Sequence, residues 1–123
     1  MSYDLVFWSD PRPDRPDPFL VYRDLIDGAT VEGLGSFNAR AMLDALAEQF
    51  AGLAAPTGDE GYTAWDGPNN ETVFEFNWSP QYLMATARGT YTNDQMNVII
   101  DIGIEVGGGR LYDPQTGERF DGQ

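Results

Sequence analysis

The sequence lacks cysteine, histidine and lysine altogether. Without cysteine and histidine, the chain cannot form a disulfide, a thiolate nucleophile, a zinc site of the Cys/His type or a Ser-His-Asp triad. Without lysine, it has neither a Schiff-base lysine nor the lysine of a phosphate-binding loop. Catalysis would have to rest on carboxylates, hydroxyl groups, arginine or a metal held by oxygen ligands. We therefore expect a protein that is not an enzyme and that holds no cofactor and no metal.

Positive charge is scarce, because only 7 basic residues, all of them arginine, stand against 20 acidic ones. The formal net charge is -13, and acids outnumber bases in every quarter of the chain. A negative field of this strength repels nucleic acid and anionic membranes and attracts basic proteins. We expect no nucleic-acid partner and no membrane partner, whereas a basic protein fits the charge. The plainer alternative is that the acidity serves only solubility.

Long apolar runs are missing too, since no stretch approaches the length that spans a membrane. The first residues enter a short apolar run without a basic segment before it, so we expect a cytoplasmic protein. Aromatic residues, in contrast, make up 13% of the chain and hydrophobic residues 41%, which supports a core. A chain of 123 residues leaves no room for two independent cores. The sequence predicts one domain over residues 1–123.

Three strands are predicted from apolar or alternating runs. Residues 3–8 are apolar apart from one aspartate and predict a buried strand, while the proline-rich residues 9–18 predict a stiff, solvated connection. Residues 73–78 and 82–87 alternate between apolar and polar side chains and predict a hairpin. The apolar side chains on one face of its first strand are Phe74, Phe76 and Trp78. An open sheet face of this kind could host an apolar ligand or pair with a second copy of the chain.

Two helices are predicted in the first half of the chain. Asp17-Pro18 is a typical helix start and predicts a helix over about 18–27. Asn38 is the expected cap of a second helix over about 38–51. The expected apolar stripes are Phe19, Tyr22 and Ile26 in the first helix, and Leu43, Leu46 and Phe50 in the second.

Residues 92–106 fit both a helix and a strand. Isoleucine and valine alternate from Val98 to Val106, and such β-branched residues favour strands. Against this, Thr92 and Gln95 form a capping box, and three glycines follow as they do at the end of a helix. We predict a helix here.

A last short strand over 110–112, followed by a turn, completes the order strand, helix pair, strand, strand, helix, strand. This βαββαβ order predicts an α+β fold of ferredoxin-like arrangement. Such a fold has a single sheet, here of about four strands, with two or three helices on one face.

The range 51–71 shows no periodicity and is rich in glycine and proline, which predicts a long loop. Long loops in compact domains are often functional. Acidic and aromatic side chains occur together in this one, and they form the predicted partner-binding site: Asp59, Glu60, Tyr62, Trp65 and Asp66. Tyr62 and Trp65 would anchor the partner, and the carboxylates would meet its arginine or lysine side chains. The alternative is a surface loop whose Trp65 packs back over the core.

Paired carboxylates could perform acid and base chemistry if their surroundings separated their pKa values. The candidates are Asp59 with Glu60, and Asp101 with Glu105. The second pair is one helical turn apart, a spacing more typical of a solvated helix face. An enzyme acting through carboxylates, or a small-molecule-binding module, is therefore the alternative to a non-catalytic binding protein.

The run from Gly109 to Phe120, Gly-Arg-Leu-Tyr-Asp-Pro-Gln-Thr-Gly-Glu-Arg-Phe, is the most distinctive part of the sequence. Together with the aromatic start Leu5-Val6-Phe7-Trp8, it resembles a family of small uncharacterised bacterial proteins. Val31-Glu32-Gly33-Leu34 and the helix from Leu43 to Phe50 are also similar to that family. Families of this kind occur among the immunity proteins of bacterial toxin systems. The resemblance implies an immunity protein that covers the active site of a cognate toxin, and it carries no functional residue across.

Overall fold

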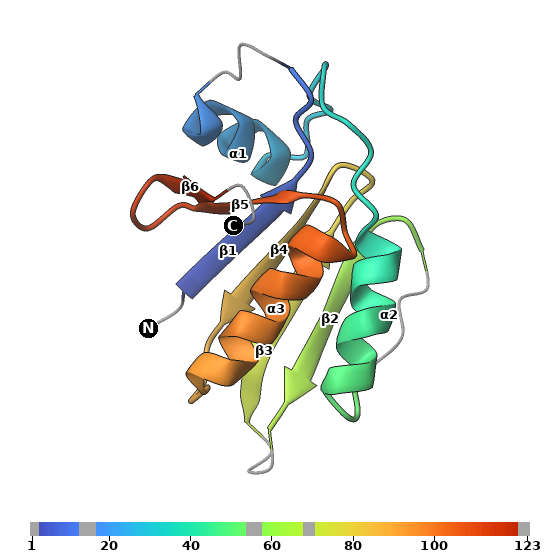
Figure 1. Cartoon of the computed structure of the whole chain (residues 1–123), viewed down its shortest axis with the longest axis vertical. Coiled ribbons are helices and arrows are strands. Elements are labelled where there is room, and N and C mark those ends of the chain that lie inside the picture. The colour runs from blue at the N-terminus through green and yellow to red at the C-terminus, as the bar shows by residue number, and fades with distance from the viewer. Residues whose placement is uncertain (1–2, 13–16, 54–57, 68–70, 121–123) are drawn as a thin grey trace.

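The computed structural model describes residues 3–12, 17–53, 58–67 and 71–120. In these ranges the chain forms one antiparallel sheet of six strands and three helices, which confirms the α+β prediction (Figure 1). The strands are β1 (Tyr3–Trp8), β2 (Gly61–Asp66), β3 (Thr72–Trp78), β4 (Tyr82–Ala87), β5 (Arg110–Asp113) and β6 (Glu118–Phe120). The helices are α1 (Pro18–Ile26), α2 (Ala39–Gln49) and α3 (Asn93–Glu105). None of these described helices has both the length and the apolar character needed to cross a membrane.

The sheet order is β2-β3-β4-β1-β5-β6, and every neighbouring pair is antiparallel. The four predicted strands are β1, β3, β4 and β5, and they occupy the central places. The predicted hairpin is confirmed, with β3 and β4 paired from Phe74 opposite Ala87 to Trp78 opposite Leu83. The expected number of four strands was too low, because β2 and β6 extend the sheet at its two edges.

β2 lies within the range 51–71, for which the sequence predicted a loop. Glycine and proline on both sides of it suggested a loop, yet Thr63 and Trp65 are strand-favouring residues two positions apart. In the structure they lie opposite Phe76 and Phe74 of β3. Pairing with a neighbouring strand outweighs the flanking glycines, so the loop prediction is corrected for this part of the range.

The turn predicted after β5 is formed, and it brings the chain back as β6. Asp113 Oδ1 accepts hydrogen bonds from the backbone N–H of Gln115 at 2.9 Å and of Thr116 at 3.4 Å. Gly117 has a φ of +76°, a left-handed conformation that glycine adopts without strain. The most distinctive run of the sequence thus builds a tight hairpin at one edge of the sheet.

Asp113 also joins this turn to β1. Tyr3 donates a hydrogen bond from its hydroxyl to Asp113 Oδ2, and the Gln115 side-chain amide donates one to Oδ1 at 2.6 Å. Burial disfavours the charged carboxylate, but the hydrogen bonds outweigh burial and hold the pKa of Asp113 below its usual value. The ionised form of Asp113 therefore stabilises the fold.

We expect Asp113→Asn to cost more stability at neutral pH than in acid. A carboxyl group whose folded pKa lies below its unfolded value of about 3.9 stabilises the fold above that pH, and the stabilisation disappears as the pH falls through the folded pKa. The difference in unfolding free energy between wild type and variant should be constant between about pH 7 and 5 and shrink below about pH 4. Urea denaturation across this range measures it, and a difference that grows towards acid would contradict the assignment.

The predicted helix starts are confirmed. The side chains of Asp17 and Asn38 each accept a hydrogen bond from a backbone N–H of the first turn, at 3.0 and 3.1 Å. Thr92 and Gln95 form the expected capping box, in which each side chain bonds the backbone N–H of the other at 3.1 and 2.8 Å. The ambiguous segment is therefore the helix α3, as predicted.

Alternate residues of β1 point to opposite faces of the sheet, and each face has its own core. Leu5 and Phe7 belong to the larger core, which α2 and α3 cover (Figure 1). Val6 and Trp8 belong to a smaller core beneath α1. The helices α2 and α3 thus share one face, but α1 lies on the other, which corrects the expectation that the helices pack on a single face; β1 buries apolar side chains on both of its faces, so each face needs a cover.

α1 buries a different stripe from the predicted one. Val21 and Leu25 are buried, whereas Phe19 and Ile26 are 51% and 38% exposed. Both stripes are apolar and helically spaced, so periodicity alone could not decide which one faces the sheet. The stripe predicted for α2 is buried as expected: Leu43, Leu46 and Phe50.

Phe74, Phe76 and Trp78 share one face of β3, as predicted, but the helices α2 and α3 cover that face. The three side chains are at most 5% exposed. These residues therefore offer no surface to an apolar ligand or to a second copy of the chain, and that expectation is corrected.

Candidate functional site

The five predicted partner-binding residues do not form one cluster. Asp59 and Glu60 are exposed and lie just before β2, at the end of the sheet where the β3–β4 turn also lies. Asp66 lies at the other end of β2 and accepts a hydrogen bond from Thr72 Oγ1 at 3.0 Å. Only Asp59 and Glu60 therefore remain together as candidates for one site.

The two aromatic residues point to opposite faces of the sheet, because they stand three positions apart in a strand. Trp65 packs on Phe50 and Phe74, with ring centroids 5.0 and 6.2 Å away, and its indole N–H donates to Ala51 O at 2.9 Å. Tyr62 is 55% exposed on the other face. Trp65 thus covers the core, as the alternative reading of this range predicted, and cannot act beside Tyr62 in one contact.

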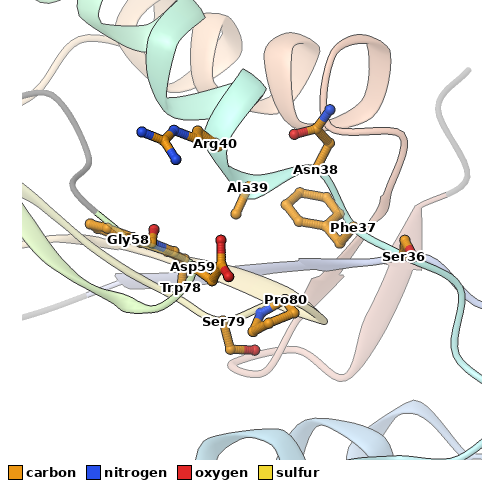
Figure 2. Close-up of a pocket in the computed structure, with 10 residues that line it drawn as sticks. All are labelled: Ser36, Phe37, Asn38, Ala39, Arg40, Gly58, Asp59, Trp78, Ser79 and Pro80. Carbon is orange, nitrogen blue, oxygen red and sulfur yellow. The ribbon is translucent and has the colours of Figure 1, made fainter.

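Two hollows open on either side of the β3–β4 turn. The first, which we call the α2 hollow, has a volume of about 560 Å³ and lies between this turn and the start of α2. Figure 2 shows Arg40 on one wall and Asp59 on the opposite wall. Ser36 and Ser79 add hydroxyl groups to its lining. Neither Arg40 nor Asp59 forms an ion pair with another described residue, so both charges are available to a ligand or partner.

The second hollow, the α1 hollow, has a volume of about 290 Å³ and lies between the turn and the end of α1. Its lining includes Glu60 and Tyr82 and, among the described residues, no base. Burial raises the pKa of Tyr82, and the Glu60 carboxylate raises it further. The Tyr82 phenol therefore stays protonated at neutral pH beside the Glu60 carboxylate.

Trp78 and the turn after it form the ridge between the two hollows. The Trp78 indole N–H donates to Gly58 O at 3.1 Å and so fixes the segment that carries Asp59 and Glu60. Pro80 O accepts a hydrogen bond from Phe37 N–H at 3.3 Å, which joins the turn to the chain before α2. The carboxylates therefore stand on a backbone that is tied to the core.

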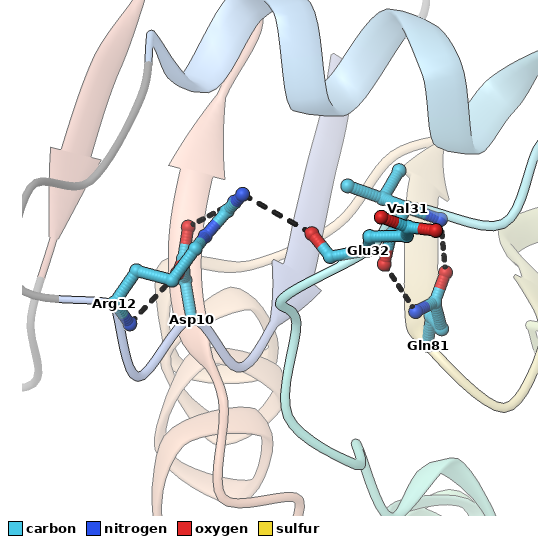
Figure 3. Close-up of polar contacts among 5 residues, drawn as sticks. All are labelled: Asp10, Arg12, Val31, Glu32 and Gln81. Carbon is cyan, nitrogen blue, oxygen red and sulfur yellow. Dashed lines mark hydrogen bonds and ion pairs between the residues drawn. The ribbon is translucent and has the colours of Figure 1, made fainter.

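Gln81 fixes the connection between α1 and α2, which borders both hollows. Its side-chain amide exchanges two hydrogen bonds with the backbone of Val31, each 2.8 Å long (Figure 3). Residues of this connection line the α1 hollow before Val31 and the α2 hollow after it. Sequence reasoning missed Gln81, because a glutamine in a turn gives no signal of a contact 50 residues away.

Arg12 and Asp10 fix the same connection from the other side (Figure 3). The Arg12 guanidinium donates to both carboxylate oxygens of Asp10 at 2.8 Å and to Glu32 O at 3.1 Å. Asp10 is only 3% exposed, so the prediction of a solvated connection after β1 is corrected at this position. The proline content concealed this pair, whose only sequence signal was an acid two residues before an arginine.

The paired carboxylates that the sequence offered do not meet in one hollow. Among the described lining residues, the α2 hollow holds Asp59 and the α1 hollow holds Glu60. Asp101 and Glu105 lie on the exposed side of α3, as expected for a solvated face. Among the described residues, no group of three carboxylates is close enough to hold a metal ion.

Comparison of the chain with protein-family models, with curated proteins and with solved structures finds no match.

Proposed function

We propose that this chain is a non-catalytic acidic binding protein, and that it acts as an immunity protein that neutralises a bacterial toxin. The observation that carries the proposal is the position of Asp59 and Glu60, two exposed neighbours that enter two hollows beside one fixed turn. A net charge of -13 attracts a basic partner from a distance. A toxin that cleaves nucleic acid has a basic substrate groove, which such a protein could cover.

The two hollows differ in the partner group that they favour. The described lining of the α1 hollow presents Glu60 and the Tyr82 hydroxyl and no base, so the hollow suits an arginine or lysine side chain. The α2 hollow contains both Arg40 and Asp59, so its charges nearly balance and it suits a polar or zwitterionic group. We therefore propose Glu60 as the main acidic contact and Asp59 as a weaker one.

We also propose that the fold is of the ferredoxin-like kind. The four central strands stand in the order β3-β4-β1-β5, and the chain connects them as strand, helix pair, strand, strand, helix, strand. This order supports a ferredoxin-like arrangement to which β2 and β6 have been added. The proposal also includes a cytoplasmic location, where a toxin that attacks the producing cell would have to be neutralised.

A small-molecule-binding module is the second candidate function, and the α2 hollow favours it. Arg40 and Asp59 on opposite walls could hold the carboxylate and the amine of an amino acid or short peptide. Binding of free amino acids to the wild type, lost in Arg40→Ala, would favour this candidate over the immunity function.

The proposed function is tested by capture from the source cell. Immobilised wild-type protein should retain a basic protein, and adding the wild type should abolish the toxic activity of the retained protein. Glu60→Gln should weaken retention about tenfold or more, because truncating one partner of a buried charge pair typically costs 2 to 5 kcal/mol. Asp59→Asn should weaken retention less, since Arg40 shares its hollow.

The matched control is Asp44→Asn with Glu48→Gln, two exposed acids on α2 outside both hollows. This control should leave retention nearly unchanged, although it removes more charge than Glu60→Gln does. Equal losses in the control and in Glu60→Gln would show a general charge effect and no site. Retention of no basic protein at all would overturn the proposed function.

A further inference from the structure

α1 carries an unusual share of the exposed apolar surface. The large hydrophobic side chains with the greatest exposure in the described residues are Phe19, Leu20, Ile26, Tyr62 and Val106. Three of these five lie on α1, a helix of nine residues. The opposite stripe of the same helix, Val21 and Leu25, is buried on the sheet, so α1 carries large apolar side chains on its exposed side as well as on its covered side.

Aromatic contacts that lead from α1 to the sheet hold this apolar stripe in place. The Phe19 ring lies 6.5 Å from the ring of Tyr22, and Tyr22 lies 5.6 Å from buried Tyr112. Asp17 caps the start of the helix through the backbone N–H of Phe19. A partner would thus meet a preformed surface, which lowers the entropy that binding costs.

Acidic side chains surround the stripe. Among the described residues on or beside α1, the acids are Asp17, Asp24 and Asp27 and the one base is Arg23, whose guanidinium is 3.6 Å from Asp24. On the sheet side, Asp4 lies close enough to Tyr22 to raise the pKa of its phenol, after the larger effect of burial. The surface therefore combines exposed apolar side chains with an excess of acidic groups around them.

We propose that the exposed stripe of α1, with the acidic groups around it, is a docking surface for an amphipathic segment of the partner that carries apolar side chains flanked by lysine or arginine. Charge decides between this occupant and a second copy of the chain, because two copies would each bring a net charge of -13 to the contact. The α1 hollow begins at the end of the same helix, where Leu25 and Gly28 line it. One partner segment can therefore reach both the stripe and Glu60.

This inference rests on the proposed function, since it assigns a second contact to the same basic partner. The probe is a synthetic amphipathic helical peptide of leucine and lysine, compared with a scrambled peptide of the same composition, by isothermal titration calorimetry. Wild type should bind the amphipathic peptide more tightly than the scrambled one. The double variant Phe19→Ser with Ile26→Ser should lower the affinity for the amphipathic peptide about tenfold or more. It should leave the affinity for the scrambled peptide unchanged.

Val106→Ser is the matched control, because Val106 is 42% exposed and lies outside α1 at the end of α3. It should change the affinity by less than about twofold. Equal affinities of wild type and the α1 variant for the amphipathic peptide would overturn the inference. A wild-type dimer that the α1 variant converts to a monomer in sedimentation would overturn it too, in favour of a second copy as occupant.

Retention of the captured basic protein by the two variants distinguishes failure of this inference from failure of the proposed function. Full retention by the α1 variant together with loss in Glu60→Gln would refute the α1 surface and leave the proposed function standing. Loss of retention by the α1 variant, with full retention by Glu60→Gln, would support the α1 surface and refute Glu60 as the main acidic contact.

Discussion

Replacing Gly103 by alanine is expected to lower the free energy of unfolding by about 2 kcal/mol, although alanine is the better helix former. Gly103 is buried in α3, where the helix crosses β1. A Cβ atom at this position would stand 2.3 Å from Cε1 and 2.4 Å from Cδ1 of Phe7. The Phe7 ring is fully buried and cannot move aside without disturbing the core. Helix propensity alone would stabilise the variant by about 1 kcal/mol. The sign of the change in unfolding free energy therefore shows whether helix propensity or the clash with Phe7 dominates.

Thermal and urea unfolding measure this change, with Asn97→Ala as the control on the exposed side of the same helix. Asn97→Ala should leave the free energy of unfolding unchanged or raise it slightly, because alanine is the better helix former and its side chain meets no neighbour at this exposed position. Combining Gly103→Ala with Phe7→Leu should cost about 1 kcal/mol less than the two single changes together, since the smaller side chain gives the new methyl group room. A Gly103→Ala variant more stable than wild type would show that α3 does not approach β1 so closely.

Removing the Arg12 side chain is expected to cost about 2 to 4 kcal/mol of unfolding free energy. The Asp10 side chain is 1% exposed, and Arg12 supplies two of the hydrogen bonds that satisfy its charge, each 2.8 Å long. Breaking a buried pair from one side leaves a charge that water cannot reach, which costs more than the pair contributes when intact. The change also removes the bond from Arg12 to Glu32 O, which helps to hold the connection beside the two hollows.

Two comparisons test this explanation by urea unfolding. Arg23→Ala removes an exposed guanidinium from the Arg23–Asp24 pair and should cost less than about 0.5 kcal/mol. The double variant Asp10→Ala with Arg12→Ala should be more stable than Arg12→Ala alone, because it no longer buries a carboxylate that has lost the guanidinium opposite it. A double variant less stable than the single one would mean that Asp10 stabilises the fold through contacts other than Arg12.

Elements with strong local signals could be predicted from the sequence. Capping side chains at Asp17, Asn38 and Thr92 placed all three helix starts, because a cap acts within one helical turn. The capping box also decided the segment that alternated like a strand. The hairpin of β3 and β4 followed from alternation alone.

Features that depend on distant partners could not be predicted. β2 forms because it pairs with β3, whereas the glycines that flank it predicted a loop. Asp10 is buried because Arg12 and the α1–α2 connection close over it. Of the predicted site residues, Asp59 and Glu60 lie beside hollows, while Trp65 faces the core because it stands three residues after outward-facing Tyr62.

Amide hydrogen exchange of the protein, free and bound to the basic protein that it captures, shows whether the partner covers the α1 hollow and α1. We expect slower exchange in the bound state at residues 58–60, at Gln81 and Tyr82, and along α1, because these backbone groups border the α1 hollow or the apolar stripe. Exchange on the exposed side of α2 and α3 should stay unchanged. Protection confined to those two helices, with residues 58–60 and α1 unaffected, would contradict this expectation.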